Sequence, residues 1–255
     1  MRYESFGITD RGLRRHHNED AFLVREDMGL YVVADGMGGH AAGEVASDLS
    51  IREVERVLTE SAGWDQDTWP SSWDAGLSSN GNRLVAAIRS AHESVAGAVE
   101  DDVGLRGMGA TIVSVLAEAT GLVTVAHVGD SRVYLLRDKG ELELVTSDHS
   151  WVHEQVVAGL LSEDAARNHP LKNVVTRALG GSHEPAVDVR EFQLQGGDLL
   201  LLCSDGLNTM LEDAVISSLC EGSRPLVSMA RDLVAEANRR GGLDNITVVL
   251  VRVLP

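Results

Sequence analysis

The 255-residue chain carries a formal net charge of −17, with 22 lysines and arginines against 39 aspartates and glutamates. Such an acidic chain lacks a broad basic face, which argues against binding to nucleic acid or to an anionic membrane. Its length suits one large domain, residues 1–255, and no apolar run is long enough to span a membrane. The N-terminus has no apolar signal core and only two cysteines are present, so we expect a cytoplasmic protein without disulfide bonds.

The first third of the chain reads as short strands followed by two helices. Residues 4–12 and 20–27 are expected to form strands around a glycine turn, and 30–35 a buried strand. A glycine-rich turn over 36–44 leads into a helix, because apolar side chains then recur at three- and four-residue steps. These side chains are Val45, Leu49, Ile51, Val54, Val57 and Leu58.

A tryptophan-containing loop is expected between the two helices, over residues 62–82. Its three rings, Trp64, Trp69 and Trp73, either cover one helix edge or form a docking patch, since aromatic clusters are typical of interfaces. The second helix is expected from about residue 83 to 100.

The middle of the chain contains four apolar runs separated by short turns, which is typical of an antiparallel meander. These runs cover residues 109–118, 121–129, 131–138 and 141–148. A mixed segment with short helical patches follows, residues 149–185. The remaining expected elements are strands over 186–194 and 197–204, helices over about 211–220 and 225–239, and a last strand over 245–253. This order predicts an α+β fold, a four-layer αββα sandwich with two central antiparallel sheets.

Three aspartates stand at the ends of apolar runs: Asp35, Asp205 and Asp244. Carboxylates at the mouth of a sheet repel one another unless a cation lies between them. Mg²⁺ and Mn²⁺ prefer such oxygen ligands, so the pattern indicates a metal centre. An aspartate before a glycine is also a common turn residue, and for a single Asp-Gly pair that reading is the simpler one.

Seven segments, in this order along the chain, carry a family resemblance. They are GLRRHHNEDAF (12–22), VADGMGGHAAGE (33–44), GMGATIV (107–113), HVGDSRVYLLR (127–137), VTSDHS (145–150), LLLLCSDGL (199–207) and DNITVVLV (244–251). Together they resemble the PPM metal-dependent protein serine/threonine phosphatases, the protein phosphatase 2C type, in their bacterial form. The resemblance covers nearly the whole chain and implies one catalytic domain, with residues 149–185 as a flap beside the metal cleft.

The resemblance implies a centre of two Mn²⁺ or Mg²⁺ ions. Asp35 would bridge both ions and the carbonyl of Gly36 would bind one, while Asp205 and Asp244 would hold the other. Two ions held in this way at about 3.5–4 Å suit an in-line displacement at phosphorus.

Further residues of the resemblance surround this centre. Glu19 and Asp20 would contribute directly or through metal-bound water, and Asp130 would support a third, weaker metal site together with Asp205. A hairpin-turn role is the alternative for Asp130. Arg15, four residues before Glu19, would grip the substrate phosphate and offset charge in the transition state.

The general acid is left open by the sequence. Animal members of the family have a histidine after the Asp-Gly pair, where this chain has Met37. His40 or a metal-bound water could protonate the leaving oxygen instead. His40 could equally be a helix-entry residue.

The implied function is hydrolysis of phosphoserine and phosphothreonine by a metal-bridged water, without a phosphoenzyme. Arg15, Asp35 and Asp205 would be the catalytic residues, and the substrates would be proteins phosphorylated by a eukaryotic-like serine/threonine kinase. One alternative is a catalytically silent PPM-fold module that binds phosphoproteins. Another is a phosphatase for small phosphoesters or for a regulatory anti-sigma antagonist.

Overall fold

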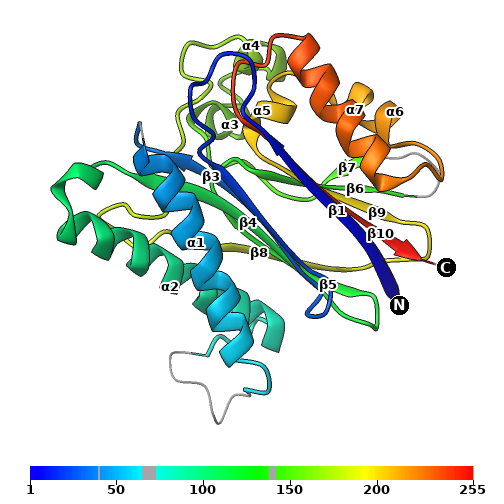
Figure 1. The fold of residues 1–255 in the computed structure, drawn as a ribbon, viewed down its shortest axis with the longest axis horizontal. Coiled ribbons are helices and arrows are strands. Elements are labelled where there is room, and N and C mark those ends of the chain that lie inside the picture. The colour runs from blue at the N-terminus through cyan, green and yellow to red at the C-terminus, as the bar shows by residue number, and fades with distance from the viewer. Residues whose placement is uncertain (40, 65–72, 138–141, 255) are drawn as a thin grey trace.

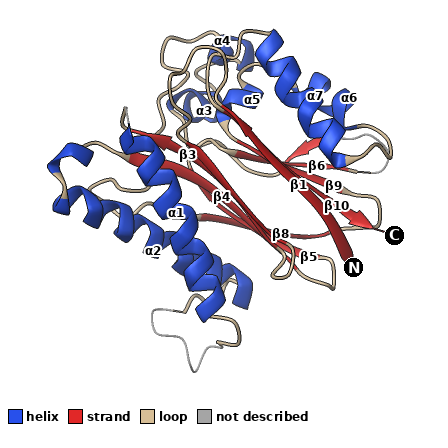
Figure 2. Cartoon of the chain, in the orientation of Figure 1, coloured by secondary structure: helices blue, strands red, loops and turns tan. Residues whose placement is uncertain are grey.

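The computed structural model describes residues 1–39, 41–64, 73–137 and 142–254. Two antiparallel sheets of five strands lie face to face, with helices on the outer side of each (Figures 1 and 2). The predicted four-layer αββα sandwich is therefore confirmed. Among the helices of the described residues, none is both long and apolar enough to cross a membrane.

The first sheet has the order β2-β3-β4-β5-β8, and each neighbouring pair is antiparallel. Its strands are β2 (Asp20–Arg25), β3 (Leu30–Met37), β4 (Gly109–Ala117), β5 (Leu122–Val128) and β8 (Asp188–Gln193). Two long helices, α1 (Ala41–Glu60) and α2 (Ser79–Asp101), lie side by side over its outer face (Figure 1).

The second sheet has the order β1-β10-β9-β6-β7 and pairs the two ends of the chain. Its strands are β1 (Arg2–Asp10), β6 (Arg132–Leu136), β7 (Leu142–Leu144), β9 (Leu199–Cys203) and β10 (Ile246–Leu254). Helices α6 (Asp213–Cys220) and α7 (Leu226–Arg239) cover its outer face. The short α5 (Asp205–Asn208) follows β9 directly.

Three apolar layers hold the sandwich together, because each strand presents alternate side chains to its two faces. Within β9, Leu200 and Leu202 pack between the two sheets, while Leu201 and Cys203 pack against the helices. Both faces are therefore buried, which is why the sequence of β9 is an unbroken apolar run. Cys203 and Cys220 are both free and buried.

The expected meander of four strands is wrong. Strands β4 and β5 pair in the first sheet, but β6 and β7 belong to the second sheet. The chain crosses from one sheet to the other at residues 129–131, where Asp130 lies. Alternation along a strand does not say which sheet the strand will join. Asp130 therefore lies in an inter-sheet corner and not in a hairpin turn.

Some element boundaries also differ from the expectation. Helix α2 begins at Ser79, because Ser78 Oγ accepts a hydrogen bond from the backbone N–H of Gly81 at 3.0 Å and caps it. The helix expected over 211–220 begins at Asp213. Trp69 of the tryptophan loop lies outside the described residues, so the two alternatives for that loop both remain predictions.

The segment over residues 149–185 contains two short helices, α3 (Trp151–Val157) and α4 (Glu163–Arg167). Its histidines make local contacts: His153 Nε2 lies 2.9 Å from Ser147 Oγ, and the ring of His169 lies 4.9 Å from that of Trp151. A cavity of about 520 Å³ separates this segment from α5 and α6, and both Asp130 and Asp205 line it.

Candidate metal centre

Two aspartates of the first sheet lie at one end of the layer between the sheets. Asp20 begins β2 and Asp35 lies near the end of β3, and the two are cross-strand partners in register. Phe22 and Val33, two residues further along their strands, pack between the sheets. Since side chains alternate, the two aspartates continue the same inter-sheet series.

The second sheet supplies two more carboxylates at the same end. Asp205 is the first residue of α5, one residue after β9 ends, and Asp244 precedes β10 by two residues. The carboxyls whose charges act on Asp35 are, in decreasing order, those of Asp20, Asp205, Asp130 and Asp244. Five aspartates from distant parts of the chain therefore meet at one edge of the sandwich.

Asp20 is fixed by hydroxyl groups of the opposite sheet. Its Oδ2 accepts hydrogen bonds from Ser204 Oγ at 2.7 Å and from Thr247 Oγ1 at 2.6 Å. Its Oδ1 is buried and has no hydrogen-bond partner, and the same is true of Asp205 Oδ1. A buried carboxylate oxygen without a partner is costly unless a cation binds it.

Burial and mutual repulsion make these carboxyls weak acids. Burial first, and then the neighbouring carboxylates, raise the pKa of Asp20 to about 7 despite its two hydroxyl donors. Burial and then the charge of Asp244 raise the pKa of Asp205 to about 6. Burial and then the charge of Asp205 raise the pKa of Asp130 to about 8. A divalent cation among them would reverse these shifts, so the residues fit an oxygen-ligated metal such as Mn²⁺ or Mg²⁺.

Glu19 is buried and its loop is held against both sheets. Its backbone carbonyl accepts a hydrogen bond from Gly36 N–H at 3.0 Å, and its own N–H donates to Asn245 Oδ1 at 2.8 Å. Gly36 has no room for a side chain, because a Cβ there would lie 2.0 Å from the carbonyl oxygen of Gly43. The Glu19 loop, the end of β3 and the start of α1 are therefore packed backbone to backbone.

Arg15 is the cation at the rim of the cluster. Its Nη2 lies 2.6 Å from Asp244 Oδ2, and 48% of its side chain is exposed. The planar guanidinium is thus beside the acids yet open to solvent, where it can reach a phosphoryl group. His40 lies outside the described residues.

Among the described residues, the structure brings together the predicted acids and Arg15, and it adds three polar residues that sequence reasoning missed. Ser204 and Thr247 orient Asp20. Asn245 donates from Nδ2 to the carbonyls of Arg11 and His17, at 2.9 Å each, and so fixes the loop that carries Arg15. Ser204 and Asn245 stand directly beside a predicted acid, and Thr247 lies three residues after Asp244. Their place in the motifs SDG and DNIT is the only signal that could have found them.

A second cluster of side chains with potential metal-ligand atoms lies near the corner that carries Asp130. It consists of His127, His149 and Asp188, whose ligand atoms all lie within 4.8 Å of one another. Sequence reasoning did not single out any of the three.

Comparisons with known proteins agree with this geometry. A family model described as protein phosphatase 2C matches residues 13–241. The serine/threonine phosphatase stp of Listeria innocua is 39% identical over 246 residues, which cover 95% of this chain and 93% of the relative. The crystal structure of the Mycobacterium tuberculosis serine/threonine phosphatase PstP/Ppp matches with a TM-score of 0.85 and 36% identity, over 100% of both chains. The PstP catalytic domain in complex with 2 manganese ions matches with a TM-score of 0.82 and 36% identity, over 99% of both chains.

Proposed function

We propose that this chain, which belongs to the protein phosphatase 2C family and is a protein serine/threonine phosphatase, hydrolyses phosphomonoesters at the acid cluster around Asp35 with two divalent cations. The observation that carries the proposal is the pair of buried, unpartnered oxygens, Asp20 Oδ1 and Asp205 Oδ1, within a group of mutually repelling carboxyls. The manganese ions of the PstP structure support the choice of metal.

Each acid has a proposed place in this centre. Asp35, which feels the charge of the four other aspartates, would bridge the two ions, and the carbonyl of Gly36 would bind one of them. Asp205 and Asp244, from the second sheet, would hold the other ion.

The remaining acids would complete the ligand set. Glu19 and Asp20 would bind directly or through water, and Asp130 would hold a third, weaker ion together with Asp205. Ser204 and Thr247 would keep Asp20 in place by donating to its Oδ2.

When bound, Mn²⁺ or Mg²⁺ would lower the pKa of a water molecule and so supply hydroxide for direct attack on phosphorus. The chain itself would position the substrate. Arg15 would leave Asp244, whose charge the cations then satisfy, and its guanidinium would bind two phosphoryl oxygens. The charge that builds on these oxygens in the transition state would strengthen that contact. A role for His40 in protonating the leaving oxygen stays a prediction.

The biological setting is inferred from the relatives. Their names as serine/threonine phosphatases or as a protein phosphatase support phosphorylated proteins as substrates, and none supports a silent binding module. We propose a cytoplasmic enzyme that reverses a partner serine/threonine kinase. Residues 149–185 would act as a flap that selects substrates, since they border the cavity that Asp130 and Asp205 line.

The test is hydrolysis of a chromogenic phosphomonoester and of a phosphothreonine peptide, with and without added Mn²⁺. Asp35→Asn should abolish both activities. Asp48→Asn, which changes an exposed acid of α1 paired with Arg52, is the matched control and should leave them unchanged. Equal turnover by Asp35→Asn and the wild type would refute the two-metal centre, while peptide binding without turnover in the wild type would favour the binding module.

A further inference from the structure

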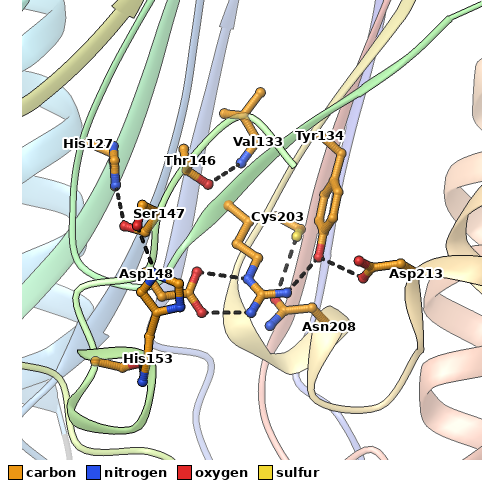
Figure 3. Close-up of polar contacts among 12 residues, drawn as sticks. His127, Val133, Tyr134, Thr146, Ser147, Asp148, His153, Cys203, Asn208 and Asp213 are labelled. Carbon is orange, nitrogen blue, oxygen red and sulfur yellow. Dashed lines mark hydrogen bonds and ion pairs between the residues drawn. The ribbon is translucent and has the colours of Figure 1, made fainter. Parts of the chain in front are cut away.

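Two consecutive residues, Asp148 and His149, form hydrogen bonds to Arg132 and Gly129, on either side of Asp130. We call this set of hydrogen bonds the clasp. On one side of Asp130, His149 N–H donates to the carbonyl of Gly129 at 3.0 Å, and Gly129 N–H donates to His149 Nδ1 at 3.1 Å. On the other side, Asp148 accepts from Arg132 Nε and Nη2 at 2.8 and 2.6 Å. Figure 3 shows Asp148 in this double contact.

The corner depends on this clasp because its backbone is unusual. Gly129 has a φ of +110°, and a Cβ there would lie 2.4 Å from Thr111 Cβ. Ser131 Oγ and Thr111 Oγ1 lie 2.7 Å apart and fix the inner side. The direction of the Asp130 carboxyl is thus set by hydrogen bonds on the residues before and after it.

The clasp requires one protonation form of His149. Since Nδ1 accepts the Gly129 N–H, the ring proton must be on Nε2, which lies 3.3 Å from Asp188 Oδ2. Arg177 Nη1 holds the other oxygen of Asp188 at 2.8 Å. A buried neutral ring agrees with this arrangement, and burial together with the nearby His127 lowers the pKa of His149 to about 4.

These contacts argue against a metal site among His127, His149 and Asp188. The two imidazole rings are stacked, with centroids 4.6 Å apart and planes at 14°, so their nitrogens do not point at a common centre. His127 Nε2 already lies 2.9 Å from the carbonyl of Ser147 (Figure 3). The guanidinium of Arg177 also lies 3.1 Å from His149 Nε2, where a cation would be repelled.

We propose that His149 is a positioning residue for Asp130, with its tautomer set by Asp188. His149 also joins the corner to the flap, because its carbonyl accepts a hydrogen bond from Thr176 N–H at 2.8 Å. The inference rests on the proposed role of Asp130 as a metal ligand. Outer partners that orient metal ligands typically change metal affinity by about 10- to 100-fold when removed.

The test compares two substitutions of His149 that distinguish the role of Nδ1 from that of Nε2. His149→Asn retains an acceptor near the position of Nδ1, whereas His149→Gln carries its amide near Nε2 and loses the Nδ1 acceptor. Hydrogen exchange of the Gly129 amide is measured by NMR in the metal-free protein. Mn²⁺ binding is measured by calorimetry, and the event that Asp130→Asn removes identifies the site in question.

We expect His149→Gln to exchange the Gly129 amide faster and to weaken the Asp130-dependent Mn²⁺ event by about 10- to 100-fold, with the other events unchanged. His149→Asn should stay close to the wild type in both measurements. His92→Gln is the matched control, because His92 Nδ1 accepts the Gly180 N–H at 3.1 Å in the same way, at the end of the flap. It should leave Mn²⁺ binding unchanged.

Normal Mn²⁺ binding by His149→Gln, or an equal loss in His92→Gln, would overturn the positioning role. If His149→Gln does not fold, Asp188→Asn replaces it, since Asp188 is half-exposed and lies outside the clasp itself. It should speed Gly129 exchange and weaken the same event, and wild-type values would overturn the inference. A wild-type protein that binds no Mn²⁺ would refute the metal centre, whereas normal binding by His149→Gln would refute only the role of His149.

Discussion

Asp20 and Asp35 are direct cross-strand partners at the end of the antiparallel pair β2–β3. The next inter-sheet side chains on these strands, Phe22 and Val33, are apolar and pack in the core between the sheets. Like charges opposite each other destabilise a sheet, so a strand pair that ends in two carboxylates is stable only if they share a proton or a cation. Binding of a metal ion should therefore increase the free energy of unfolding of this protein more than that of a β-sandwich without such paired carboxylates.

Mn²⁺ should raise the melting temperature of the wild type, because it binds the folded state only. At a free concentration about 100 times the dissociation constant the gain is about 2.7 kcal/mol. Asp35→Asn removes one of the repelling charges, so without metal it should be at least as stable as the wild type, and it should lose most of the gain. Calorimetric scans with Mn²⁺ and with a chelator give both values. A variant that gains as much from Mn²⁺ as the wild type would contradict the bridging role of Asp35.

Arg15→Ala should lower kcat/KM for a phosphothreonine peptide by about 100-fold, as loss of a donor to the transition state does elsewhere. Arg15→Lys should recover only part of this, because an ammonium cannot bind two phosphoryl oxygens side by side. The half-exposed pair with Asp244 is worth at most about 1 kcal/mol, so urea unfolding should show little change. Steady-state kinetics that match the wild type would exclude Arg15 from phosphate binding.

Gly36→Ala should destabilise the protein by about 1–3 kcal/mol, because the new Cβ meets the carbonyl oxygen of Gly43 and the backbone must move. Mn²⁺ affinity should fall as well, since Asp35 moves with it. Gly97→Ala is the control: nothing lies within 4 Å of its Cβ, and alanine in a helix should stabilise by about 0.5–1 kcal/mol. Denaturant unfolding and calorimetric Mn²⁺ titration of both variants test this contrast, and equal effects in both would contradict it.

The stability of the protein should depend on the protonation of His149. Burial first, then His127 and Arg177, lower its pKa from 6.5 to about 4, while Asp188 opposes this shift. As pH falls below 6.5, the unfolded chain therefore takes up a proton before the folded one does. The contribution of the neutral ring is complete above 6.5 and is lost as pH falls towards about 4.

Urea unfolding at several pH values across this window, for the wild type and for His149→Asn, measures the effect as a difference between the two proteins. The wild type should lose its advantage over the variant as the pH falls. A constant difference would mean that His149 has an ordinary pKa or is charged in the folded state. Because both proteins carry the same carboxyl groups, the contributions of these groups to the pH dependence of stability cancel in the comparison.

The sequence alone predicted the layers and most of the acids, for identifiable reasons. A strand buried on both faces must be apolar throughout, so runs such as 199–203 are visible without a structure. Where such a run ends in Asp205, or where Asp35 interrupts one, the charge stands out against its surroundings. Order along the chain and these local contrasts were sufficient for the fold class and the family resemblance, and they are the basis of the proposed divalent metal.

Only the tertiary structure decided how these pieces meet. Alternation could not tell that the chain changes sheets at Asp130, because β5 and β6 have the same local pattern. The hydroxyl donors to Asp20 come from Ser204 and Thr247, which are 184 and 227 residues away in sequence, and no local pattern indicates these contacts. The same is true of the hydrogen bonds between His149 and Gly129. Hydrogen bonds of this kind depend on which backbones pack together, and that is a property of long-range burial and not of any one segment.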